Sequence, residues 1–162
     1  MTTIRPAISA DIDSLIALLK ILFSIEEDFK FEPQMQRHGL EMLLANPQGC
    51  ILVAENSEGV IGMCTGQLTI STAEGGPAAL IEDIVVSEKY RRQGLGKLLL
   101  KRVSNWARTK NVSRLQLLAD QNNEAALDFY KSIGWQKTQL ICLRKHISWL
   151  HNQEPWTTAI FF

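Results

Sequence analysis

The segment of residues 81–100, IEDIVVSEKYRRQGLGKLLL, constrains the fold more than any other part of the chain. It begins as an apolar run that is typical of a strand, but two adjacent carboxylates, Glu82 and Asp83, interrupt that run. A loop with two glycines follows and leads directly into an amphipathic helix predicted over residues 94–109. The next apolar stretch predicts a strand at 114–120. This strand–helix–strand order predicts a parallel strand pair joined by a right-handed crossover.

The remaining periodicity and turn residues predict a mixed sheet in a single domain. Strands are predicted at 2–7, 50–55, 60–70, 78–86 and 135–145, and helices at 12–23, 33–45 and 123–134. Pro33 favours the start of the second of these helices, whereas Gly39 is unfavourable in its middle. Hairpins before the parallel pair make the predicted sheet mostly antiparallel. The fold class is therefore α/β or α+β, with helices flanking the sheet.

Composition excludes several classes of protein. The 162 residues carry a formal net charge of zero, which argues against broad electrostatic binding of nucleic acid or anionic membranes. No apolar run approaches the roughly 20 residues that a membrane span needs, and the first residues do not resemble a secretory signal. Three scattered cysteines, Cys50, Cys64 and Cys142, predict neither a disulfide framework nor, with the three histidines, a zinc site. We therefore expect a cytoplasmic protein without a metal.

The glycine loop, RRQGLGK, has the composition of an anion site. Gly94 and Gly96 allow a tight turn and a close approach of backbone N–H groups to a ligand. The helix that begins there offers unpaired N–H groups and the positive end of its dipole. Two familiar phosphate motifs are excluded, because no G-x-x-x-x-G-K-[ST] occurs and Leu99 stands where G-x-G-x-x-G needs its last glycine. The alternative is a flexible helix start with solvated basic residues.

Two separated motifs resemble the GNAT family of N-acetyltransferases. Residues 91–96, Arg-Arg-Gln-Gly-Leu-Gly, match that family's Arg/Gln-x-x-Gly-x-Gly/Ala signature. Asn123, Ala126 and Tyr130 resemble its second half-motif, in which these residue types stand on one short helix before Gly-Phe; here Trp135 replaces the phenylalanine. The resemblance implies a domain over residues 1–145. It does not cover the apolar tail of 146–162, which we expect either to pack on the sheet or to form a homodimer contact.

The resemblance also implies acetyl-CoA as cofactor, held where the parallel strands at 80–86 and 114–120 splay apart. The backbone of Ile84, Val85 and Val86 is then expected to pair with the pantetheine arm. Asn123 and Ala126 are expected to lie near the thioester. The pyrophosphate is expected to bind the N–H groups of Arg91, Arg92, Gln93, Gly94, Leu95, Gly96 and Lys97.

The implied reaction moves an acetyl group to a primary amine of a small molecule or peptide, by direct attack in a ternary complex. An ammonium must first lose a proton, and Glu82 is the preferred base; Asp83 is the alternative, or binds a cationic substrate. Successive strand residues face opposite sides, so both carboxylates enter one cleft only if a bulge turns one of them. Tyr130 is expected to protonate the departing thiolate. The N–H of Val85 or Val86 is a candidate oxyanion donor.

The acceptor is less well determined by the sequence. Residues 23–33, FSIEEDFKFEP, are acidic, which suits a cationic acceptor such as a polyamine, an aminosugar or a lysine side chain. The alternative is an ordinary solvated helix end. A second function also stays open, namely a non-catalytic acyl-CoA-binding sensor or regulatory module.

Overall fold

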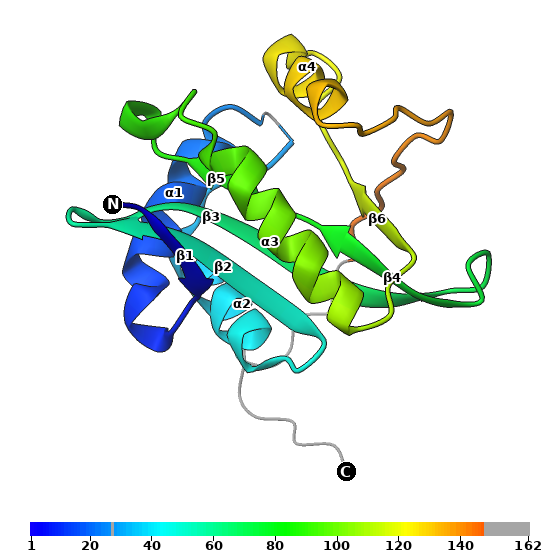
Figure 1. Cartoon of the computed structure of the whole chain (residues 1–162), viewed down its shortest axis with the longest axis horizontal. Helices are drawn as coiled ribbons and strands as arrows, with labels where there is room; N and C mark the ends of the chain where they lie inside the picture. Colours follow the sequence, from blue (N-terminus) through cyan, green and yellow to red (C-terminus); the bar gives the residue numbers. More distant parts are fainter. Residues whose placement is uncertain (27, 148–162) are drawn as a thin grey trace.

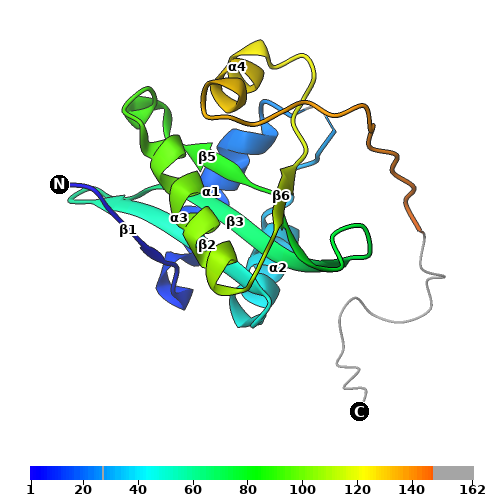
Figure 2. The same ribbon diagram turned by 45° about the vertical axis from the view of Figure 1, so that its right-hand side comes forward.

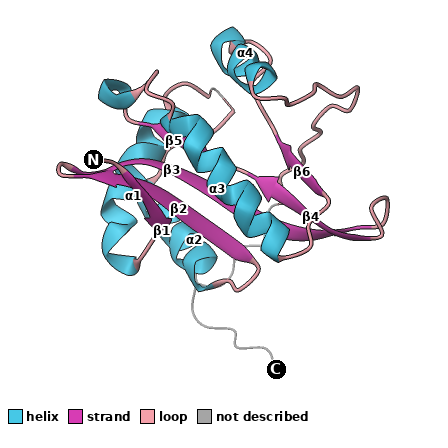
Figure 3. Ribbon diagram, viewed as in Figure 1, coloured by secondary structure: helices cyan, strands magenta, loops and turns pink. Residues whose placement is uncertain are grey.

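A computed structural model describes residues 1–26 and 28–147 as one mixed sheet with helices on both faces (Figure 1). The strands are β1 (Thr3–Pro6), β2 (Gly49–Asn56), β3 (Gly59–Ser71), β4 (Gly76–Ile81), β5 (Ile84–Val86) and β6 (Arg114–Leu117). The α-helices are α1 (Ile12–Phe23), α2 (Pro33–Ala45), α3 (Leu95–Thr109) and α4 (Glu124–Ser132) (Figure 3). Short 3₁₀ turns cover Ser9–Asp11 and Glu88–Tyr90.

The sheet has the order β1-β2-β3-β4-β6, and β5 pairs with β3 beyond the end of β4. All pairings are antiparallel except that of β4 with β6, which α3 connects. The predicted mixed, mostly antiparallel sheet with one parallel pair is therefore confirmed.

Two apolar layers hold the helices to the sheet, with α1 and α2 on one face and α3 on the other (Figure 2). Val53 and Met63 pack with the leucines of α1, whereas their strand neighbours Leu52 and Cys64 pack with α3. Because alternate strand residues face opposite sides, β2 and β3 are buried on both faces. This explains why their sequences are continuous apolar runs rather than alternating ones.

The strand predicted at 135–145 is wrong. In the structure this segment has no regular secondary structure, and Leu140, Ile141 and Leu143 are more than 80% exposed. Cys142, predicted to lie in that strand, is also exposed. Apolar periodicity indicates which side chains suit a sheet, but a strand also needs a partner edge to hydrogen-bond with, and no described strand provides one here. The tail predicted to pack or dimerise lies, from residue 148 onward, outside the described residues.

No helix in the described part of the chain combines the length and the apolarity needed to cross a membrane. The same residues contain no group of three or more His, Cys, Asp or Glu side chains that could hold a metal ion.

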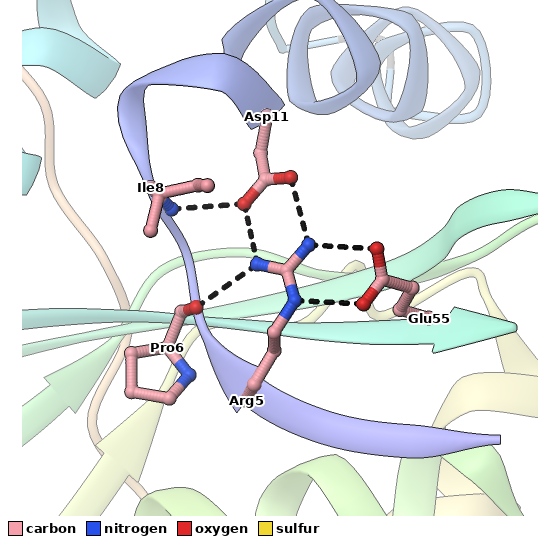
Figure 4. Close-up of polar contacts among 5 residues, drawn as sticks. All are labelled: Arg5, Pro6, Ile8, Asp11 and Glu55. Carbon is pink, nitrogen blue, oxygen red and sulfur yellow. Dashed lines mark hydrogen bonds and ion pairs between the residues drawn. The ribbon is translucent and has the colours of Figure 1, made fainter.

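Arg5 ties the first strand to the first helical turn and to the end of β2 (Figure 4). Its guanidinium donates two hydrogen bonds to Asp11, at 2.7 and 3.0 Å, and two to Glu55, at 2.8 and 2.9 Å. Asp11 is only 6% exposed and also accepts the Ile8 N–H at 2.8 Å. The Arg5 hydrogen bonds hold the pKa of the Asp11 carboxyl below its usual value. Planar bidentate pairing of this kind requires arginine rather than lysine.

We predict that Arg5→Met lowers the free energy of unfolding by about 1.5–3 kcal/mol, because it leaves the buried Asp11 carboxylate without its cation. The loss is expected at neutral pH and should shrink as the pH falls through the depressed pKa of Asp11, since protonated Asp11 no longer needs Arg5. Urea unfolding at pH 7 and pH 3 measures both effects. Lys89→Met, which breaks an exposed pair with Glu58, is the control and should change stability little. Equal losses in the two variants would contradict the prediction.

Candidate active site

The segment predicted as one strand, 78–86, is interrupted by a β-bulge. Gln67 of β3 pairs with Leu80, and Cys64 pairs with Ile84. Three residue steps along β3 are therefore matched by four steps along the opposing segment, so one extra residue is inserted between β4 and β5.

The bulge brings both predicted carboxylates to one cavity. Glu82 and Asp83 line a cavity of about 490 Å³ that lies between α1, α2 and the sheet. Their environments differ: Glu82 is exposed and accepts the Gln67 side-chain amide at 3.2 Å, whereas Asp83 is half-buried. Burial first, and then the negative charges of Glu82 and Glu26, raise the pKa of Asp83 to about 6, against the lowering effect of its hydrogen bond with Thr65.

Thr65 of β3 holds the bulge in place. Its side chain is fully buried and its hydroxyl donates to the Asp83 carboxylate at 2.9 Å. The same hydroxyl oxygen accepts the Asp83 N–H at 2.9 Å, and the Thr65 N–H donates to the Asp83 carbonyl at 2.9 Å. Sequence reasoning missed this residue. The available signal was a hydroxyl side chain within the apolar run of residues 60–66.

β5 presents an open edge on the side away from β3. β6 pairs with β4 only from Ala78 to Ile81, and none of the described strands pairs with the outer edge of β5. Figures 1 and 2 show β6 running toward α4 rather than alongside β5. The structure thus contains the splayed parallel pair that was predicted from the resemblance.

The register decides which peptide groups face that open edge. The Thr65 N–H donates to the Asp83 carbonyl and the Ser87 N–H donates to the Ile61 carbonyl, both at 2.9 Å. Hydrogen-bonded pairs alternate along an antiparallel ladder, so the Val85 peptide groups point at β3. The N–H groups of Ile84 and Val86 point outward. Because the Val85 peptide groups face β3, they are not available to pair with a ligand or to donate a hydrogen bond to an oxyanion.

The glycine loop is exposed and ends at the first turn of α3. Arg92 and Gly94 adopt left-handed backbone conformations, with φ of 61° and 81°, and Gly94 is the N-cap of the helix. The first helical hydrogen bond runs from the Leu98 N–H to the Gly94 carbonyl at 3.0 Å, so earlier N–H groups have no intrahelical acceptor. Arg92 and Lys97 are exposed and form no ion pair with a described residue.

Two predicted loop residues have internal contacts as well. Arg91 donates from Nε to the Val86 carbonyl at 3.1 Å, which ties the loop to the open edge of β5. Gly96 faces α4: a Cβ atom at this position would lie 3.3 Å from the Phe129 ring. A side chain on Gly96 would therefore disturb the packing of α3 against α4 as well as the loop itself.

The residues of the second half-motif lie on α4 and at its N-cap, as predicted, but the Asn123 side chain already has a hydrogen-bond partner within the protein. The Asn123 side-chain oxygen caps the helix by accepting the Ala126 N–H at 3.0 Å. Tyr130 is half-buried, with its ring 5.3 Å from that of Phe129 and 6.0 Å from that of Trp135. Burial raises the pKa of the Tyr130 hydroxyl, so the phenol keeps its proton at neutral pH.

The acidic stretch of residues 23–33 divides in the structure. Glu26 is half-buried, and its charge raises the pKa of both Asp83 and Tyr130, which places it near them. Burial raises the pKa of Glu26 itself, followed by the charges of Asp120 and Asp28. Glu32 instead pairs with Lys30 at 2.7 Å. The sequence could not distinguish these positions, because all the acidic residues of this stretch look alike in a solvated run.

The open edge of β5, the free N–H groups at the start of α3 and the half-buried Asp83 carboxylate belong to one mixed α/β fold. Comparison with known proteins identifies the class further. The chain belongs to the Acetyltransferase (GNAT) family, which its residues 15–135 match. Members of this family use acetyl-CoA.

One curated relative is a thialysine N-epsilon-acetyltransferase of Bos taurus, 41% identical over 56 residues. That match covers 35% of this chain and 33% of the bovine protein, so the chain spans only about a third of this relative.

Two solved structures have the same fold over nearly the whole chain. A transcriptional regulator from Bacillus halodurans has a TM-score of 0.79 at 24% identity and covers 91% of this chain and 100% of its own. An aminoglycoside N-acetyltransferase in complex with CoA has a TM-score of 0.79 at 17% identity, covering 90% of this chain and 95% of its own. At these identities the two structures establish the fold alone.

We predict that Thr65→Val lowers the free energy of unfolding by about 1–3 kcal/mol, because it removes the hydroxyl that satisfies the Asp83 N–H and carboxylate. The pKa of Asp83 should rise above its value of about 6, since the hydroxyl hydrogen bond favours the charged form. Urea unfolding and an NMR titration of the Asp83 carboxyl measure the two effects.

Thr69→Val is the matched control, because Thr69 is exposed on the same strand. If Thr65→Val behaves like Thr69→Val in both measurements, Thr65 does not hold the bulge.

Proposed function

We propose that this protein is an acetyl-CoA-dependent N-acetyltransferase that moves the acetyl group to a primary amine of a small molecule or peptide by direct attack in a ternary complex. The observation that carries the proposal is the bulge between β4 and β5, which places an outward-facing backbone edge beside a half-buried carboxylate. The bovine relative, named for acetylation of an amine nitrogen of thialysine, supports an amine as acceptor.

The residues present fit acetyl-CoA. The outward N–H groups of Ile84 and Val86 suit the amide-bearing pantetheine arm, which can pair with a free strand edge. The first-turn N–H groups of α3, with Arg92 and Lys97 exposed beside them, suit the pyrophosphate. When bound, acetyl-CoA supplies an acetyl group activated as a thioester.

Asp83 fits the role of base better than Glu82 does. A carboxyl group with a pKa of about 6 is mostly ionised at pH 7 and is a stronger proton acceptor than an ordinary aspartate. Thr65 fixes its position, whereas Glu82 is exposed and hydrogen-bonded to Gln67. Asp83 takes the proton from the amine, directly or through water. Of the two candidate oxyanion donors, only Val86 has its N–H on the open edge, because the Val85 N–H points at β3.

Tyr130 holds the proton that the departing sulfur needs. A phenol whose pKa is raised by burial stays protonated at neutral pH, and a CoA-type thiolate is the conjugate base of a thiol similar to cysteine. The packing of its ring between Phe129 and Trp135 limits the rotation of the side chain.

We predict that kcat/KM rises with pH through an inflection near 6, because the base must be ionised. Asp83→Asn should remove this inflection and lower kcat/KM about 100-fold. Thiol release from acetyl-CoA, followed from pH 5 to 9, measures both. Glu82→Gln is the matched variant and should keep the inflection. If Glu82→Gln abolishes it and Asp83→Asn does not, the two carboxylates have the reverse roles.

We predict that Tyr130→Phe lowers kcat about 100-fold while the affinity for acetyl-CoA stays the same, because the ring packing is kept and only the proton donor is lost. Calorimetric titration with CoA and steady-state kinetics separate the two quantities. Unchanged turnover would remove Tyr130 from the mechanism. CoA binding without turnover on any amine would instead favour a non-catalytic acyl-CoA-binding module.

A further inference from the structure

The cavity beside the bulge carries two carboxylates on the sheet side, and its helical walls are mostly apolar. Its volume of about 490 Å³ lies within the range of small-molecule sites. The sheet contributes Glu82, Asp83 and Gln67, while the helical walls are mainly apolar, with Phe23, Met35 and Met42, and also carry the amides of Gln36 and Asn46. The two carboxylates are the only acidic side chains among the described residues that line it.

Gly39 leaves open space in the wall that α2 forms. It lies between Met35 and Met42 at helical spacing, so the three share one face of α2. Glycine in the interior of a helix is unfavourable relative to alanine. Neither backbone nor packing requires it here, because φ is not in the left-handed region and an added Cβ would meet no atom within 4 Å. Its effect is to widen the cavity.

The two methionines beside it are exposed apolar side chains on the cavity wall. Met35 is 60% exposed and Met42 is 61% exposed. Methionine is flexible and polarizable, so such a wall adapts to the carbon body of a ligand. A ligand that covers both side chains removes apolar surface from water and is stabilised by that burial.

We propose that the acceptor is a primary monoamine on an unbranched alkyl or arylalkyl body. The body lies along Met35, Gly39 and Met42, and the single ammonium faces Glu82 and Asp83. A second ammonium on that body meets no further carboxylate among the described lining residues, whose other polar side chains, Gln36, Asn46 and Gln67, are neutral amides. The cavity therefore favours an acceptor with one ammonium over one with two. The choice of acceptor rests on the proposed acetyl transfer, whereas binding of the amine does not.

Two ligands of equal length test the charge selection. Hexylamine and 1,6-diaminohexane share the same six-carbon chain and differ in the second amine. With acetyl-CoA, kcat/KM for hexylamine is expected to exceed that for the diamine by at least about tenfold. A diamine that reacts as well as hexylamine, or better, overturns the proposal.

A variant tests the place of the carbon body. Gly39→Leu fills the open space, so the ratio of kcat/KM for hexylamine to that for ethylamine is expected to fall about tenfold. Gln34→Leu adds the same side chain on an exposed position of α2 that does not line the cavity, and is expected to keep the ratio. An unchanged ratio in Gly39→Leu overturns the proposal.

Calorimetric binding of hexylamine, with CoA present and no acetyl donor, separates this inference from the proposed reaction. If hexylamine binds the unaltered protein and binds Gly39→Leu about tenfold more weakly, the cavity assignment stands even if no amine is acetylated. If amines are acetylated but hexylamine binding is the same in Gly39→Leu, the reaction stands and the cavity assignment fails.

Discussion

The hydrogen bonds between Thr65 and Asp83 are the interaction on which the rest of the site depends. They fix the one-residue insertion that separates β4 from β5. In a regular strand the side chains of Glu82 and Asp83 would point to opposite faces of the sheet. The bulge brings both to one cavity, and Ile84 and Val86 then have outward-facing N–H groups on an edge that none of the described strands pairs with. The buried Thr65 hydroxyl thus determines both the position of the Asp83 carboxylate and which peptide groups of β5 face outward.

The layers of the fold separate two opposite electrostatic environments. The exposed cations and the free N–H groups lie at the start of α3, on one face of the sheet. The carboxylates open toward the cavity bounded by α1 and α2, on the other face. β5 packs against both α1 and α3. Under the proposed function, the phosphates of acetyl-CoA would therefore lie apart from the acidic side chains.

The sequence predicted those parts of the fold and site that depend on local chemistry. Pro33 is the first residue of α2 and Gly94 is the N-cap of α3, each as its backbone preference requires. The strand predicted at 135–145 failed because alternation describes side chains and not the availability of a partner edge. The direction of the Val85 peptide groups could not be predicted from the sequence either, because the insertion of a single residue reverses it.

By itself the sequence determined the order of the helices and of most strands, the glycine-led start of α3, and the residue types available for acid–base chemistry. These follow from short-range preferences of glycine, proline and apolar periodicity, which a linear pattern records. Only the tertiary structure decided that Asp83 rather than Glu82 is half-buried, that Glu26 approaches it, and that Gly39 opens onto a cavity. Burial, charge proximity and empty space arise between segments far apart in the chain, so no local pattern contains them.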